Sequence, residues 1–97
     1  MPILTLKLSA QAHIQNTSVL TQALTALSHR VLHKRSDVTS VVLQRIAQED
    51  WWVGGEVSAQ VFAQLDIRIT QGTNTEEEKA AFIAQAYALL SEHLDKG

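Results

Sequence analysis

The chain contains no cysteine, and Pro2 is its single proline. Without cysteine there is no disulfide framework, no thiolate nucleophile and no cysteine-based zinc site. No apolar run approaches the roughly 20 residues of a membrane-spanning helix. The start of the chain also lacks the basic segment and apolar core that mark a signal peptide. We therefore expect a protein of the cytoplasm that has no membrane partner.

The chain also has no large excess of positive or negative charge. Eight lysines and arginines stand against ten aspartates and glutamates, which gives a formal net charge of −2. A nucleic-acid-binding domain usually carries a basic excess, so we expect no nucleic-acid partner. The 97 residues have the size of one domain. A core of this size is modest, and oligomerisation is one way to add stability.

The hydrophobic pattern predicts five main elements. Alternating or β-branched runs predict strands over residues 3–8, 40–47 and 61–70, and helical spacing predicts helices over residues 17–34 and about 75–94. Residues 9–16 are expected to be a polar connection, and Gly54-Gly55 a turn. Thr75 and Glu78 have the spacing of a capping box. The order β-α-β-β-α predicts an α+β fold, with one sheet covered on one face by two helices.

An internal repeat divides the chain into two halves. The run Leu4–Ser9 (LTLKLS) matches Leu65–Thr70 (LDIRIT) in character at every position. Each copy leads through a polar loop into an amphipathic helix. We expect a single domain over residues 1–97, with a β-α-β half over about 2–56 and a β-α half over about 61–94.

Three segments carry a family resemblance: Met1-Pro-Ile-Leu4, Asp50–Glu56 (DWWVGGE) and Ile69–Lys79 (ITQGTNTEEEK). In this order they resemble the tautomerase superfamily, which is typified by oxalocrotonate tautomerase and macrophage migration inhibitory factor. The resemblance implies a doubled β-α-β unit, commonly assembled as a trimer. A final strand after the second helix is not apparent, since the sequence stops at Leu94-Asp-Lys-Gly97.

The resemblance also implies an activity. Such proteins move a proton between carbon and oxygen of a small keto or enol acid without a cofactor, and the role of general base falls on the amine of Pro2 after removal of Met1. If Met1 is retained, the Pro2 nitrogen is an amide and cannot act as a base. From the residue alone, Pro2 also simply suits the start of a strand, where no N–H is required. Trp51 and Trp52 are expected to line the pocket, to pack a subunit interface, or both.

The carboxylate-binding residues match less well. Ser40 and Thr73 occupy positions where the family often has arginine. Arg45 and Arg68 are therefore the candidate cations, although a solvated or interface salt bridge is an alternative role for each. The loss of the expected arginines puts the substrate, and activity itself, in question.

A second hypothesis is not enzymatic. The same element order suits a catalytically silent tautomerase-like protein or a ferredoxin-like ligand-binding or regulatory module that forms oligomers. His29 and His33 are four residues apart on the first predicted helix, a spacing that can hold a metal. The glutamate of a His-Glu-x-x-His motif is absent, however, with Arg30 in its place. We therefore expect both histidines on a solvated face and no metal site.

Overall fold

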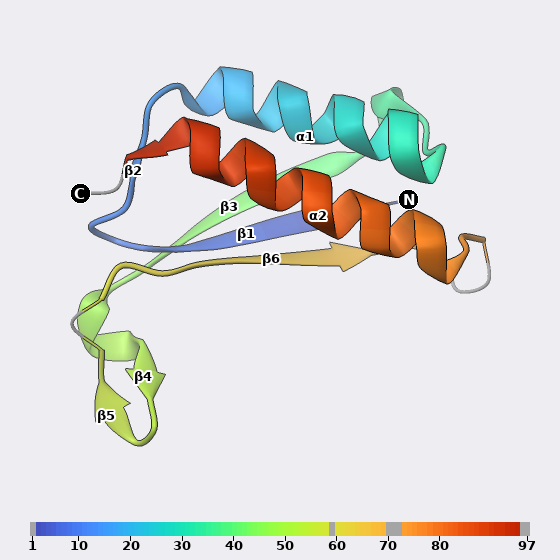
Figure 1. The fold of residues 1–97 in the computed structure, drawn as a ribbon. Coiled ribbons are helices and arrows are strands. Elements are labelled where there is room, and N and C mark those ends of the chain that lie inside the picture. Colours follow the sequence, from blue (N-terminus) through green and yellow to red (C-terminus); the bar gives the residue numbers. More distant parts are fainter. Residues whose placement is uncertain (1, 59, 70–72, 96–97) are drawn as a thin grey trace.

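The main sheet has three strands in the order β3-β1-β6 (Figure 1). The computed structural model describes residues 2–58, 60–69 and 73–95. The strands are β1 (Ile3–Ser9), β3 (Ser40–Ile46) and β6 (Ala63–Arg68). The central strand β1 pairs parallel with β3 and antiparallel with β6. Because a parallel pair needs a crossover connection, the chain passes through a helix between β1 and β3.

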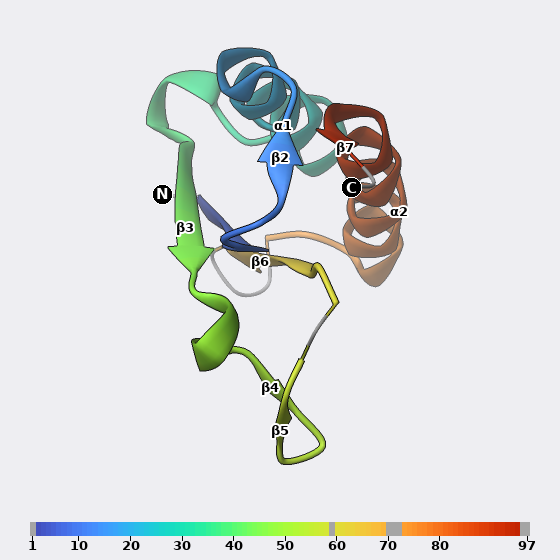
Figure 2. The ribbon, with the colours of Figure 1, turned by 90° about the vertical axis from the view of Figure 1, so that its left-hand side faces the viewer.

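Two helices, α1 (Thr17–Leu32) and α2 (Glu76–His93), cover the same face of this sheet (Figures 1 and 2). Alternation along β1 sets the two faces: Leu4, Leu6 and Leu8 are fully buried under the helices, and the residues between them lie on the open face. The helices complete this core with Leu20, Leu24, Leu27, Leu32, Phe82, Ala86 and Leu90. The predicted order of main elements and the two-layer α+β fold are confirmed.

Local side-chain chemistry explains where the helices begin. The side chain of Asn16 caps α1 by accepting a hydrogen bond from the Val19 N–H at 3.1 Å. At α2, Thr75 Oγ1 accepts from the Glu78 N–H at 3.0 Å, and the Glu78 carboxylate accepts from the Thr75 N–H at 2.8 Å. The predicted capping box is therefore confirmed.

A small hairpin projects from the end of the sheet at which β1 and β3 end (Figures 1 and 2). It consists of β4 (Trp52–Val53) and β5 (Glu56–Val57), which follow the short helix η2 (Gln48–Asp50). Gly54 and Gly55 connect the strands with φ of 63° and 83°. Two positive φ values in a row are what a type I′ hairpin turn requires, and glycine adopts them without a Cβ clash. The predicted turn is confirmed.

Two expectations need correction. The segment 9–16 is not only a connection, because it contains β2 (His13–Ile14). This strand pairs antiparallel with β7 (Leu94–Asp95), directly after α2. Thus a short strand does follow the second helix, but it does not join the main sheet. Two-residue strands are too short to leave a periodic signal in the sequence.

The apolar face of α2 is less completely covered than the sequence predicts. Helical spacing in the sequence predicts an apolar stripe of Ile83, Ala86, Tyr87, Leu90 and Leu94. Ala86 and Leu90 are buried, but Ile83 is 49% exposed and Tyr87 67% exposed, while Phe82 is fully buried. The reason is the position of α2 over β6, the last strand of the sheet, so that part of the stripe extends past the sheet edge. The remaining short element is η1 (Ser36–Val38), which precedes β3.

Candidate active site

Pro2 is buried at the amino end of the central strand. Its carbonyl accepts a hydrogen bond from the backbone N–H of Ser40 at 3.0 Å. Ile3, the next residue, lies opposite Ser40 in β3 and Arg68 in β6. The start of β3 and the end of β6 therefore flank Pro2, and by alternation its ring has the orientation of Leu4, on the helix-covered side.

Arg68 is the predicted cation that lies nearest to Pro2 along the sheet. Residues directly opposite in an antiparallel pair share a face, so the side chain of Arg68 lies with Ile3 on the open side of the sheet and is exposed. Arg68 and Pro2 thus occupy the same end of the sheet on different faces.

A cation that the sequence reasoning missed also reaches this end. Lys34 lies in the connection from α1 to β3, and its Nζ donates a hydrogen bond to Thr73 Oγ1 at 2.8 Å. Thr73 lies in the connection from β6 to α2. An ammonium therefore stands at one of the two positions that the family resemblance left without an arginine. The signal that could have identified Lys34 is the parallel pairing of β1 with β3, because it brings the residues before β3 to the same end of the sheet as Pro2.

Polar contacts connect the start of α2 to the end of α1 beside this site. Asn74 Nδ2 donates to the Leu32 carbonyl at 2.9 Å, and His33 Nε2 lies 3.1 Å from the Glu78 carboxylate. The backbone N–H of Thr75 holds the pKa of the Glu78 carboxyl below its ordinary value; Asn74 and His33 act in the same direction, and partial burial opposes them. His33 itself has φ of 58° and ends α1 in the left-handed conformation.

Arg45, Trp51 and Trp52 lie at the opposite end of the sheet from Pro2. Arg45 lies opposite Leu8, six residues along β1 from Pro2, which corresponds to about 20 Å at 3.3 Å per residue. Its guanidinium donates a hydrogen bond to the Ala12 carbonyl. Within one chain, these three predicted residues are therefore not brought together with Pro2.

The two tryptophans are in different environments. Trp51 stacks on Phe62, with ring centroids 5.4 Å apart and an interplanar angle of 18°. Trp52 donates its indole N–H to the Glu49 carbonyl at 2.8 Å and remains 60% exposed at the base of the hairpin. Trp51 thus packs within the chain, whereas Trp52 offers most of its surface to the surroundings.

The histidines of α1 have local partners. His29 Nδ1 lies 3.0 Å from the Lys34 carbonyl, and His33 pairs with Glu78. Within residues 2–58, 60–69 and 73–95, no group of three or more metal-ligating side chains is gathered. In the same part of the chain, no helix has the length and apolarity needed to cross a membrane.

The mixed three-stranded sheet under two helices, built from a repeated β-α unit whose first copy begins at the buried Pro2, defines the tautomerase fold.

Solved structures with this fold are similar to the chain. The match to a fused 4-OT (oxalocrotonate tautomerase) wild-type symmetric trimer covers 93% of this chain and 72% of the 4-OT chain, with a TM-score of 0.76 and 24% identity. The match to Pt0534, inactivated by 2-oxo-3-pentynoate, covers 94% of this chain and 72% of the Pt0534 chain, with a TM-score of 0.80 and 14% identity. The match to a macrophage migration inhibitory factor-like protein from Entamoeba histolytica covers 95% of this chain and 75% of that protein's chain, with a TM-score of 0.70 and 15% identity.

These comparisons confirm the tautomerase fold that the resemblance in the sequence predicted. No family model matches the sequence, and no curated protein is significantly similar to it.

Proposed function

We propose that this chain is a cofactor-free tautomerase or isomerase of a small keto or enol acid, acting in the cytoplasm with the amine of Pro2 as general base. The observation that carries the proposal is the burial of Pro2 at the start of the central strand of a tautomerase fold. Removal of Met1 is required, because only a free amine has a lone pair that can accept a proton.

The chemistry is a proton transfer without net change in the enzyme. The Pro2 nitrogen accepts the proton of the enol hydroxyl, the carbonyl forms as the carbon–carbon double bond shifts, and the resulting ammonium returns a proton to the carbon. An α-amine ordinarily titrates near 8, so an enclosed position with cations nearby favours the neutral base at pH 7. The adjacent strand backbone fixes the direction of the ring.

Lys34 and Arg68 are the candidate groups for the substrate carboxylate, and Lys34 is the stronger one because Arg68 lies on the open face of the sheet and Pro2 on the helix-covered face. Both belong to segments that meet the Pro2 end of the sheet, and Thr73 holds the Lys34 ammonium at 2.8 Å. A cation and a carboxylate form a charge-assisted hydrogen bond, which is stronger than a neutral one. Arg45, Trp51 and Trp52, which lie at the other end of the chain's own sheet, contribute to this site only from a second copy.

We further propose that the chain forms a homotrimer. Two of the similar structures are described as symmetric trimers of fused 4-OT. The exposed apolar hairpin of this chain supports association, because apolar surface of this kind is usually covered by a partner.

The test is ketonisation of the enol of phenylpyruvate by tag-free protein whose mass shows that Met1 has been removed. Replacing Pro2→Ala should lower the rate by about 100-fold or more, the usual range for loss of a general base, while the circular dichroism spectrum stays unchanged. The matched control is the same protein with Met1 retained, which should be equally inactive because its Pro2 nitrogen is an amide.

Unchanged turnover in the Pro2→Ala variant would sink the mechanism. A wild-type protein that is inactive on several enol and dienol acids would instead support the silent or regulatory alternative. The uncharged Ser40 and Thr73 at the two arginine positions favour that alternative.

A further inference from the structure

The two halves of the chain differ in the strands that lie beside their first strands, β1 and β6. Strands β1 and β6 are antiparallel neighbours, and each is followed by a helix on the same face, so the halves β1-α1 and β6-α2 are related by an approximate two-fold axis. On the other side of β1 lies β3. Among the described residues, no strand occupies the corresponding side of β6. Alternate backbone N–H and C=O groups of β6 therefore point away from the sheet without a strand partner.

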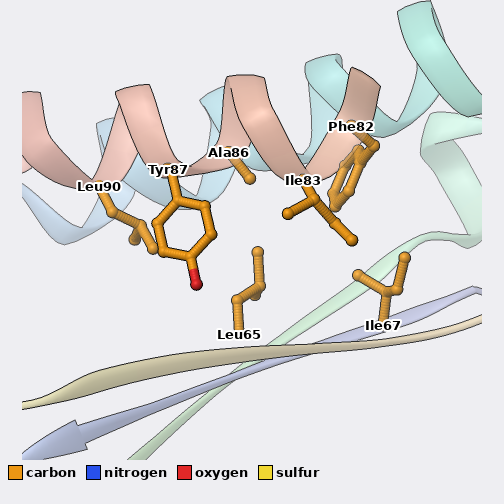
Figure 3. A pocket seen from close by; sticks show the side chains of 7 residues that line it. All are labelled: Leu65, Ile67, Phe82, Ile83, Ala86, Tyr87 and Leu90. Atoms are coloured by element: carbon orange, nitrogen blue, oxygen red, sulfur yellow. The ribbon is translucent and has the colours of Figure 1, made fainter. Parts of the chain in front are cut away.

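A cavity of about 180 Å³ lies between α2 and β6 (Figure 3). Leu65 and Ile67 form its floor, while Ile83 and Tyr87 reach down from α2 toward them. A void of about 150 Å³ can hold a benzene ring, so this cavity has room for one or two aliphatic side chains. The open edge of β6 and this cavity together are called the α2–β6 groove below.

A comparison of burial between the two halves shows that the apolar residues of β6 are less well covered than those of β1. In the sequence repeat, Leu4 and Leu6 correspond to Leu65 and Ile67. Leu4 and Leu6 are fully buried because β1 has a strand on both sides, whereas Leu65 and Ile67 are only partly buried. Above the groove, Ile83 is 49% exposed and Tyr87 67% exposed. One additional strand beside β6 would cover this surface.

We propose that the α2–β6 groove binds an extended peptide segment as an added strand, parallel to β6, with two alternating apolar side chains under α2. The open backbone edge favours a strand over a small apolar molecule, which could fill the cavity but could not pair with β6. This mode of recognition takes affinity from main-chain hydrogen bonds and specificity from pockets for alternate side chains. The parallel direction follows from the two-fold relation, since β3 runs parallel to β1.

The first half of the chain indicates the sequence pattern that fits. In β3, Val41 and Leu43 lie opposite Leu4 and Leu6 and pack against the core. The equivalent positions of a strand beside β6 need the same two apolar side chains, separated by one residue. A synthetic peptide with the sequence of residues 38–47 (VTSVVLQRIA) is therefore a suitable probe.

The experiment titrates the full chain into the fluorescently labelled 38–47 peptide and follows anisotropy. We expect saturable binding that weakens at least about tenfold when the peptide carries Val41→Asp and Leu43→Asp, since a charge cannot enter an apolar cavity without cost. In the protein, Ile83→Lys should weaken binding to a similar degree. Its matched control is Ala84→Lys, which adds the same charge to the next exposed position of α2, outside the lining of the cavity.

The proposal fails if the peptide does not bind, if the Asp-containing peptide binds equally well, or if Ile83→Lys and Ala84→Lys behave alike. Sedimentation velocity tests the remaining candidate occupant of the groove, a second copy of the chain. If the wild-type protein is an oligomer that Ile83→Lys dissociates and Ala84→Lys does not, and this wild-type oligomer does not bind the peptide, a second copy fills the groove and the peptide proposal is overturned. None of these variants alters Pro2, so the outcome is separate from that of the tautomerase assay.

Discussion

At the scale of single residues, Lys34 is the side chain that most changes the expectation for substrate binding. It supplies a cation beside Thr73, where the family resemblance left an uncharged position. We predict that Lys34→Gln raises KM for an enol acid about tenfold and lowers kcat less, because it removes one charge-assisted contact to the carboxylate. Steady-state kinetics of the enol assay measure both constants.

Arg35→Gln is the matched control for Lys34. Arg35 is the next residue in the same connection, and its guanidinium is paired with Asp37 at 2.6 Å. It should leave both kinetic constants nearly unchanged. An equal rise in KM for the two variants would mean that the region acts through its general positive charge, and that Lys34 does not hold the carboxylate.

Ser28 presents a second residue-scale question, concerning stability. It is fully buried on α1, and among the described residues its hydroxyl has no hydrogen-bond partner. A buried unsatisfied hydroxyl costs about 1–3 kcal/mol. We therefore predict that Ser28→Ala raises the free energy of unfolding by about 1 kcal/mol, measured by urea denaturation. Thr25→Ala is the control, because Thr25 Oγ1 donates to the Thr21 carbonyl at 2.8 Å; if Ser28→Ala destabilises the fold, the hydroxyl is satisfied in solution.

At the scale of secondary-structure elements, we expect the start of α2 to make a pH-dependent contribution to stability. The pKa of Glu78 is lowered in the folded state, chiefly by the Thr75 N–H, whereas an unfolded glutamate titrates near 4.3. The unfolded state therefore binds the proton more readily in this range. The contribution to stability is complete above the unfolded pKa and is lost as pH falls through the lower folded pKa.

We predict that Glu78→Gln flattens the decrease in stability below about pH 5, followed by urea denaturation at a series of pH values. The glutamine oxygen can still accept from the Thr75 N–H, so the variant removes the charge and keeps the cap. Glu77→Gln, in the same helical turn but outside the capping box, should retain the wild-type acid profile. Identical profiles for wild type and Glu78→Gln would show that this carboxylate does not control the acid limb.

The elements also show what the sequence could and could not predict. Strong local signals succeeded: the Leu4–Leu8 alternation, the Thr75–Glu78 capping box and the Gly54-Gly55 turn each depend on neighbours in the chain. The exposure of Ile83 and Tyr87 could not be predicted, because it depends on which strand lies at the edge of the sheet. Lys34 was missed for the same reason, since its proximity to Thr73 follows from strand order and not from spacing.

At the scale of the whole molecule, the hairpin is the feature that points beyond one chain. Trp52 is 60% exposed, Val53 54% and Val57 43%, on the hairpin that projects from the end of the sheet opposite the start of β1 (Figure 1). Apolar surface gathered on a projecting element usually marks an interaction site. We expect the protein to self-associate at micromolar concentration; sedimentation of the wild-type protein as a monomer would count against a trimer.

The proposed self-association would allow Pro2 and Trp52 to share a site. More than about 20 Å of sheet separates them within one chain, so Trp52 can approach Pro2 only from a second copy. We predict that Trp52→Ala lowers turnover, and that mixing it with inactive Pro2→Ala protein under conditions of subunit exchange restores part of the activity. In a mixed oligomer, an intact Pro2 from one chain then meets an intact Trp52 from the other. The comparison is between the mixture before and after exchange: an unchanged rate means that Trp52 acts only on its own chain, whereas a rise above the sum of the two variants places the active site at the boundary between copies.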